Sequence, residues 1–254
     1  KVKMFQDQCF TNYFILCYDS VRDIVFITTQ KCGQTFIGTH LDGVHFEVMN
    51  HKNTNRLTYE LGDKILHEFT EAGSSFKELF NCETVEEVLN TKQCYFVIRN
   101  PKKRFFSGVA QIIIQRFKET EDASDIWDFK KYNEPEVEVI KHMKSDEGQD
   151  WLRKELSKLS LSDLDDEHIY PIFDFYTKYL WRPHHKTINL SDLSSWFEGV
   201  EPKRWNPYLI NDKSEIYKKW ILDSEHPIHR LLLEYDDIYN KEVIAWENLK
   251  REEC

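Results

Sequence analysis

The sequence lacks any long apolar run and shows no recognisable leader at its start. No run approaches the roughly 18 residues that span a bilayer, so a membrane-spanning segment is not expected. The absence of a visible signal segment favours a cytoplasmic protein. Because position 1 is Lys rather than Met, removal of a leader stays open, and with it a location in the Golgi lumen.

Patterns for metal binding and for nucleic-acid binding are also missing. The six cysteines are scattered without a C-x-x-C pair, so neither a zinc site nor a disulfide framework is expected. The formal net charge is −10, whereas domains that bind nucleic acid carry a basic surplus. We therefore expect no metal and no nucleic-acid partner.

The composition that is present suits a folded α/β domain. Hydrophobic residues make up 41% and charged residues 31%, while glycine occurs only 8 times, so each loop glycine needs a physical reason. A chain of 254 residues is long enough for one large α/β domain. No internal repeat or linker divides it, and we interpret residues 1–254 as one domain.

Segments rich in β-branched and aromatic residues predict five strands. They are residues 12–18, 23–29, 44–50, 94–98 and 185–190. The second and fourth are almost entirely apolar, as in strands that are buried on both faces. With helical patterns between the strands, the sequence predicts a P-loop-like, three-layer α/β/α fold around a mainly parallel central sheet.

Helical spacing of apolar residues predicts the remaining elements. Helices are expected at 35–40, 59–71, 84–90, 101–118, 150–159, 172–180, 192–198 and 213–250, the last broken near Pro227. In 59–71, four apolar residues share one helical face: Leu61, Ile65, Leu66 and Phe69. Ser191 is the expected N-cap of the helix 192–198. Residues 119–150 are interpreted as helices with a mobile segment at 145–148, and as a possible lid or acceptor-binding element.

The first candidate site is the turn Lys31-Cys32-Gly33-Gln34-Thr35, which follows the strand 23–29. Its glycine allows a tight turn, and the N–H groups at the start of the next helix point toward whatever lies above. Lys31 adds a positive charge and Thr35 a hydroxyl, a set that suits a phosphate or sulfate group. The Walker A pattern G-x-x-x-x-G-K-[ST] is absent. The alternative is an ordinary strand–helix turn with an exposed lysine.

The second candidate site follows the strand 94–98, where the sequence reads RNPKKRFFS from Arg99 to Ser107. Residues 99–118 contain six basic residues and no acidic one, which in an acidic protein indicates a local anion site. Cations at a helix start oppose the helix dipole, so a bound anion explains them better than a solvated helix face does. The Arg99 guanidinium and the Ser107 hydroxyl suit a phosphate group. Arg104 either assists them or pairs with an acidic residue.

Together the two motifs resemble those of the sulfotransferases that use 3′-phosphoadenosine 5′-phosphosulfate (PAPS). The patterns K-x-G-x-T after an early strand and R-x-P-x-x-R-x-x-S after a middle strand carry the resemblance. It implies that PAPS is the co-substrate and that the 5′-phosphosulfate binds at Lys31, Cys32, Gly33, Gln34 and Thr35. It also implies that Arg99 and Ser107, with Arg104, hold the 3′-phosphate. Residues 166–171 (DEHIYP) resemble the H-x-x-P element of Golgi carbohydrate members, the group closest in pattern.

The resemblance implies in-line transfer of a sulfuryl group to a hydroxyl of a small molecule or a glycan. Lys31 would stabilise the leaving 5′-phosphate, and a general base would take the hydroxyl proton. The candidates for the base are His51, Glu47 and His45, in that order, because the strand 44–50 ends where the ligand is expected. His168 either contacts the acceptor or nucleotide or is a buried residue that ties a loop.

Two other functions stay open on the sequence alone. A P-loop-type phosphoryl transferase, similar to a kinase, requires Mg²⁺ ligands and a second loop glycine, and neither is evident. The other alternative is a non-catalytic module that binds a nucleotide or polyanion, against which the presence of Lys31, Arg99 and Ser107 argues. The acceptor and the oligomeric state are not readable from the sequence.

Overall fold

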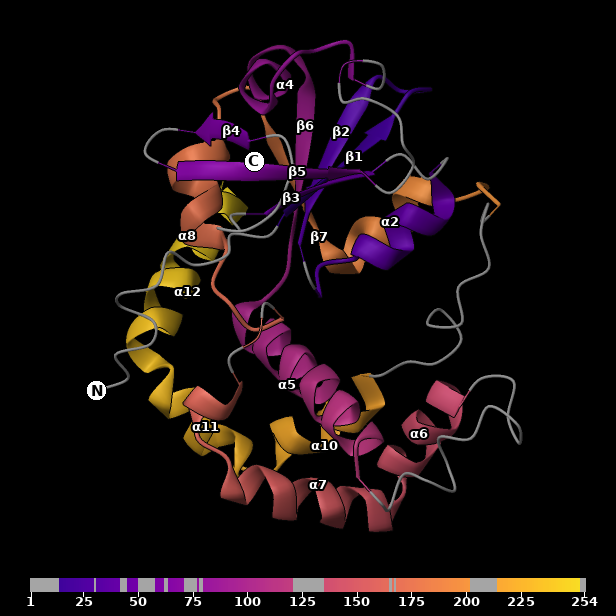
Figure 1. Cartoon of the computed structure of the whole chain (residues 1–254), viewed down its shortest axis with the longest axis vertical. Coiled ribbons are helices and arrows are strands. Elements are labelled where there is room, and N and C mark those ends of the chain that lie inside the picture. The colour runs from indigo at the N-terminus through magenta and orange to yellow at the C-terminus, as the bar shows by residue number, and fades with distance from the viewer. Residues whose placement is uncertain are drawn as a thin grey trace.

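Seven strands form one sheet in the part of the chain that the structure describes (Figure 1). The structure is a computed structural model that describes residues 14–29, 31–41, 45–49, 58–61, 64–70, 77, 80–120, 135–164, 166, 168–201 and 214–251. The strands are β1 (Phe14–Asp19), β2 (Ile24–Thr28), β3 (His45–Met49), β4 (Thr58–Leu61), β5 (Lys64–Thr70), β6 (Gln93–Ile98) and β7 (Lys186–Asn189). Their order across the sheet is β4-β5-β3-β1-β2-β6-β7.

The sheet is mixed, and its parallel part is the part that carries the two predicted motifs. β2 pairs with β6, and β6 with β7, in parallel. The β1–β2, β1–β3, β3–β5 and β4–β5 pairings are antiparallel. The α/β class is thus confirmed, but parallel pairing is confined to β2, β6 and β7. Only residues 20–23 separate β1 from β2, which is too short for a parallel crossover.

Helices and helical turns connect and cover the strands. The α-helices are α2 (Gln34–His40), α4 (Val85–Thr91), α5 (Pro101–Lys118), α6 (Pro135–Lys144), α7 (Asp146–Lys158), α8 (Phe173–Phe175), α10 (Ser214–Leu222), α11 (Ile228–Glu234) and α12 (Asp236–Arg251). The shorter turns are the 3-10 turns η2 (Leu161–Leu164) and η4 (Leu190–Phe197) and the π-type turn η3 (Tyr176–Leu180).

Both faces of the sheet are covered. On one face, Ile37 of α2 and Phe197 of η4 pack with Phe26 of β2. On the other face, α4, α8 and α12 pack with Val25 and Ile27 of the same strand. Because alternate residues of a strand point to opposite faces, β2 supplies two cores at once. This double burial explains why its sequence is apolar at nearly every position.

Helix α5 begins just beyond the end of β6 and runs away from the sheet toward a separate group of helices (Figure 1). It is amphipathic only weakly, because most of its circumference is buried. Phe106 and Ile113 of α5 share a core with Leu152 of α7, Trp220 of α10 and Leu231 of α11. The start of α5 is therefore held between the sheet and this helical group.

The predicted helix at 59–71 is wrong, because the structure forms β4 and β5 there. β5 pairs antiparallel with both β3 and β4. The spacing of four residues between Leu61, Ile65 and Phe69 equals two strand repeats and also about one helical turn, so the pattern fits both structures. The available partner strand β3 decides between them.

Two local predictions near helix starts also change. Residues 145–148, predicted to be mobile, form the cap and first turn of α7, where the Ser145 hydroxyl accepts a hydrogen bond of 3.1 Å from the Gly148 N–H. A Cβ on Gly148 would clash with the main-chain oxygen of His142, so the turn packs tightly on the preceding helix. Ser191 is not an N-cap, because it lies inside η4, which begins one residue earlier after Asn189.

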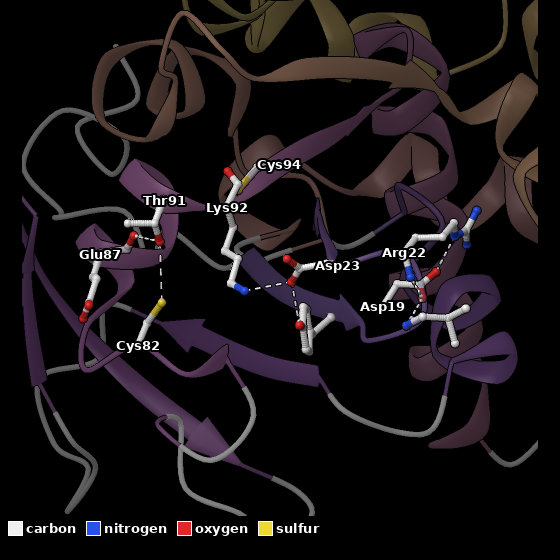
Figure 2. A network of polar contacts seen from close by, with 10 residues as sticks. Asp19, Arg22, Asp23, Cys82, Glu87, Thr91, Lys92 and Cys94 are labelled. Carbon is white, nitrogen blue, oxygen red and sulfur yellow. Dashed lines mark hydrogen bonds and ion pairs between the residues drawn. The ribbon is translucent and has the colours of Figure 1, made fainter.

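A network of polar contacts lies at the edge of the sheet where β2 and β6 begin (Figure 2). The Lys92 ammonium donates to the Asp23 carboxylate at 2.7 Å. Arg22 pairs with Asp19 at 2.5 Å and donates to the main-chain oxygen of Trp196 at 2.9 Å, which fastens η4 to the sheet. This edge lies opposite the carboxyl ends of β2 and β6, so its charged residues are suitable controls for substitutions at those ends.

Candidate anion-binding site

The two predicted motifs meet at the carboxyl ends of neighbouring parallel strands. Ile27 of β2 is in register with Phe96 of β6, so the two strands end at the same level. The turn 29–33 follows β2 and leads into α2, while Arg99 and Asn100 follow β6 and lead into α5. In open α/β sheets, this is where ligands bind.

Arg99 joins the two motifs directly. Its Nη1 donates a hydrogen bond of 2.8 Å to the main-chain oxygen of Lys31. Its Nη2 donates at 2.5 Å to the hydroxyl of Tyr217 on α10, whose ring centroid lies 5.9 Å from the guanidinium carbon. These two bonds use two of the five N–H groups of the guanidinium, so the side chain is oriented while retaining donors for a ligand.

The turn after β2 has an unusual backbone conformation. Lys31 has a φ of 64° and Gly33 a φ of 85°, both in the left-handed region. A Cβ on Gly33 would lie 2.6 Å from a methyl carbon of Leu193 and 2.8 Å from one of Leu190, so η4 packs closely over the turn. A lysine held in this region is uncommon, and such strain is found most often at functional sites.

Cys32 faces the interior, away from the other residues of its motif. Its side chain is fully buried, and burial raises the pKa of its thiol. Its N–H donates to the Thr29 oxygen at 3.0 Å, and its oxygen accepts from the Thr28 hydroxyl at 2.6 Å. Both main-chain groups thus help to build the turn, and the contact of Cys32 with the co-substrate stays a prediction.

The Lys31 ammonium points to helix α5. Its Nζ donates to the side-chain oxygen of Gln111 at 3.3 Å. Gln111 lies one helical turn after Ser107, so the two polar side chains share a face of α5. Ser107 itself is buried, with 7% of its surface exposed. One face of α5 therefore carries Ser107 of the second motif and Gln111, which bonds Lys31 of the first.

Arg104 is buried as a structural ion and is not displayed at the sheet edge. It is 3% exposed and donates to the main-chain oxygen of Tyr170 at 2.5 Å. Burial raises the pKa of Glu242 on α12, and the positive charge of Arg104 opposes that rise. Glu242 in turn accepts hydrogen bonds from the N–H groups of Ile172 and Phe173 at 2.7 and 2.9 Å. The charge of Arg104 thus acts on an acidic residue, and its contact with a nucleotide stays a prediction.

The segment that resembles the H-x-x-P element lies against the same helix. Gly108 of α5 meets the main chain of His168, and a Cβ on Gly108 would lie 2.6 Å from the Ile169 side chain. The Asp166 carboxylate forms a hydrogen bond with Nδ1 of the His168 ring. It also accepts a hydrogen bond of 2.8 Å from the main-chain N–H of His168. Burial raises the pKa of Asp166, but hydrogen bonds from His168 and the charge of Lys31 outweigh it and hold this pKa below its usual range.

The sequence-based candidates for the general base are placed only in part. His51 lies outside the described residues. Glu47 and His45 belong to β3, where Glu47 pairs with Ile15, which pairs in turn with Thr28 of β2. Glu47 is thus level with the end of β2 but separated from it by β1, a distance of about 10 Å between strand axes. Thr35 and Gln34 lie in the first turn of α2.

Sequence reasoning missed Gln111, Tyr217 and Gly108. The helical repeat could have indicated Gln111, because it follows Ser107 by four residues on the predicted helix. No sequence signal connects Tyr217 to Arg99, since the two residues are 118 positions apart and meet only through the packing of α10. The need for glycine at position 108 is explained only by the close approach of residues 168 and 169.

Within the described part of the chain, no group of three or more His, Cys, Asp or Glu residues is arranged to hold a metal ion. No described helix is both long enough and apolar enough to cross a membrane. Comparison with known proteins identifies no relative, because no family model, no curated protein and no solved structure matches the chain. The chemistry of the site itself must therefore supply the functional assignment.

Proposed function

We propose that the chain is a PAPS-dependent sulfotransferase with a P-loop-like fold. The hydrogen bond between Arg99 and the main chain of Lys31 is the observation that carries this proposal most directly. It sets the two anion-binding motifs side by side, as an adenosine nucleotide with phosphates at both its 3′ and 5′ positions requires. A nucleotide phosphorylated only at the 5′ position gives no reason for a second basic motif.

In this proposal the 5′-phosphosulfate lies over the turn at Lys31 and Gly33, and the 3′-phosphate lies at Arg99 and Ser107. Transfer is an in-line displacement at sulfur, and negative charge grows on the oxygen that bridges sulfur and the 5′-phosphate. The Lys31 ammonium stabilises that charge, and Gln111 holds the ammonium near the sheet edge before the ligand binds. Arg104 acts through the structure, by fixing the segment that ends at Tyr170.

The acceptor is a hydroxyl of a small molecule or a glycan. His51 and Glu47 stay candidates for the base because β3 runs in the same direction as β2 and ends at the same edge of the sheet. The alternative, a kinase-like phosphoryl transferase, would use the turn at Lys31 but leaves the Arg99–Ser107 motif without a ligand group.

Titration calorimetry with 3′-phosphoadenosine 5′-phosphate (PAP) and with ATP–Mg²⁺ tests the proposal. We expect PAP to bind at least tenfold more tightly, a difference of about 1.4 kcal/mol, because ATP lacks the 3′-phosphate. The companion assay follows labelled sulfate from PAPS to hydroxyl acceptors. Tighter binding of ATP–Mg²⁺ than of PAP would reject the sulfotransferase assignment in favour of phosphoryl transfer.

The assay needs a matched control for the loss of a partly buried lysine. Lys31→Ala is expected to abolish transfer, whereas Lys92→Ala is expected to leave it unchanged. Lys92 is also a bonded lysine next to a strand end, but it pairs with Asp23 at the opposite edge of the sheet (Figure 2). A loss of transfer in both variants would indicate a general effect on folding and not a role for Lys31.

A further inference from the structure

Asp166 and His168 form a bonded carboxylate–imidazole pair. The Asp166 carboxylate contacts Nδ1 of the His168 ring and also accepts the His168 main-chain N–H at 2.8 Å. A carboxylate at Nδ1 favours the tautomer in which Nδ1 carries the proton and Nε2 has a free electron pair. The ring contact that the structure shows is at Nδ1, so Nε2 is the ring nitrogen left for a ligand.

The pair is fixed in position by contacts on either side. The main chain of His168 rests on Gly108, where any side chain would clash. Tyr235 donates its hydroxyl to the Ile169 oxygen at 2.8 Å, and Arg104 donates to the Tyr170 oxygen at 2.5 Å. These main-chain contacts are enough to fix the position of residues 168–170. They therefore do not explain why the Asp166 and His168 side chains bond each other.

The pair also lies beside the groups of the candidate site. Gly108 is adjacent in sequence to Ser107 and lies one turn before Gln111, which bonds the Lys31 ammonium. The Lys31 charge helps to keep the Asp166 carboxylate ionised. The imidazole is therefore held against the same helix that carries a predicted 3′-phosphate ligand and the residue that positions the predicted catalytic lysine.

We propose that His168, oriented by Asp166, is the general base of sulfuryl transfer. This inference rests on the function proposed above. The acceptor oxygen forms a bond to sulfur, and the bond between sulfur and the bridging oxygen of the 5′-phosphate breaks with its electron pair left on that oxygen. The acceptor proton passes to Nε2, PAP leaves, and the Asp166 carboxylate stabilises the imidazolium.

Other charged residues lie on the elements near the pair. Asp166 stands on the same turn, Lys31 projects from the turn after β2, and Arg104 lies on α5. Glu242 of α12 lies behind Arg104 and is buried. Substitutions that test His168 therefore leave these four residues intact, except where Asp166 itself is the target.

The experiment compares four variants: His168→Gln, Asp166→Asn, His51→Gln and the control His184→Gln. His184 is an exposed histidine just before β7, at the opposite edge of the sheet. The acceptors are desulfated chondroitin, desulfated heparin and 4-nitrophenol, with labelled PAPS as donor. PAP affinity is measured on each variant by calorimetry.

For His168→Gln we expect kcat to fall about 100- to 10,000-fold while PAP affinity changes little, because a general base acts only on the chemical step. The acid-side fall of the rate with pH should disappear in this variant, and Asp166→Asn should give a smaller loss of kcat. A purely structural role would lower PAP affinity and kcat together. Retention of the rate and of its acid limb in His168→Gln, or loss of that limb only in His51→Gln, would overturn the inference.

A second readout does not depend on the acceptor. In protein labelled with ¹⁵N-histidine, and with the signal assigned by its absence from His168→Gln, the neutral ring should carry its proton on Nδ1. Addition of PAP should move this signal and leave that of His184 in place. A proton on Nε2, or a signal that PAP does not move, contradicts the inference. Failure of the wild-type protein to bind PAP instead rejects the proposed function as a whole.

Discussion

The Arg99 guanidinium donates a hydrogen bond of 2.8 Å to the main-chain oxygen of Lys31, across 68 positions of sequence. The bond ties the end of β6 to a residue whose φ of 64° is unfavourable for a lysine. The same side chain is both a predicted phosphate ligand and a support for the other predicted phosphate loop. A substitution at Arg99 therefore acts on both ends of the proposed nucleotide.

Arg99→Lys tests that double role while keeping the positive charge. A lysine cannot reach the Lys31 oxygen and the Tyr217 hydroxyl with one planar group, so we expect PAP affinity to fall about 10- to 100-fold. Calorimetry measures the affinity. Arg182→Lys is the control, since Arg182 also makes several bonds but to Asn90 and Glu86 of α4. Unchanged PAP affinity in Arg99→Lys would contradict a role for the two hydrogen bonds of the Arg99 guanidinium in nucleotide binding.

Gly33→Ala should destabilise the protein by about 1–3 kcal/mol. The φ of 85° disfavours any Cβ, whereas the two leucine methyl groups in its way belong to flexible side chains and can move. Gly38→Ala is the matched control in α2, the helix that Gly33 precedes, because a Cβ at Gly38 meets nothing within 4 Å. We expect that variant to be more stable by about 0.5–1 kcal/mol. Urea unfolding gives both values, and equal stabilities would contradict the account of the turn.

Ser107 and Arg104 belong to one sequence motif, yet we expect different effects from their substitution. Arg104→Met removes the cation beside the buried Glu242 and should cost about 3–5 kcal/mol of stability. Ser107→Ala should leave the stability nearly unchanged and lower the affinity for PAP. Thermal unfolding and calorimetry separate the two effects. A stable Arg104→Met variant with weakened PAP binding would restore Arg104 as a nucleotide ligand.

Acid should destabilise the fold through two buried histidines. Burial lowers the pKa of His185 to about 3 and that of His226 to about 4, from 6.5 in the unfolded chain. Both therefore bind protons more readily when unfolded, so their contribution is fully present above about pH 6.5 and is lost as the pH falls. Each should lower the free energy of unfolding by about 2 kcal/mol between pH 7 and pH 5.

Urea unfolding of the wild type and of His185→Phe at both pH values isolates one of these contributions. Neither ring nitrogen of His185 has a hydrogen-bond partner in the described part of the chain, and Phe96 and Trp181 lie against the ring, so a phenyl ring suits the site. The variant should lose about 2 kcal/mol less than the wild type on acidification. An identical loss in the two proteins would show that His185 is not buried in its neutral form.

The sequence predicted β2 and β6, which the two motifs follow, better than it predicted the other strands of the sheet. β2 and β6 are continuous apolar runs, and the residues that end them, Lys31 and Arg99, are marked by a nearby glycine or proline. These strands can be recognised from their own residues, because a strand that is buried on both faces is apolar at nearly every position. β4 and β5 were missed because a spacing of four residues fits helix and strand alike, and the pairing with β3 that decides the matter is not local.

The burial of Arg104 could not be predicted for a similar reason. Glu242, whose pKa the charge of Arg104 lowers, is 138 positions away on α12, and no periodicity within α5 reveals which of its basic residues is buried. The Asp166–His168 pair is local, two residues apart, but its relation to Lys31 depends on the packing of its turn on Gly108.

A crystal structure of the protein soaked with PAP tests the central claim most directly. The account predicts the 5′-phosphate within about 3 Å of the Lys31 ammonium and the 3′-phosphate within about 3 Å of Arg99 and the Ser107 hydroxyl. The adenosine of the bound PAP then bridges the ends of β2 and β6. A nucleotide bound elsewhere, or one that places only a single phosphate at this edge of the sheet, would contradict the account.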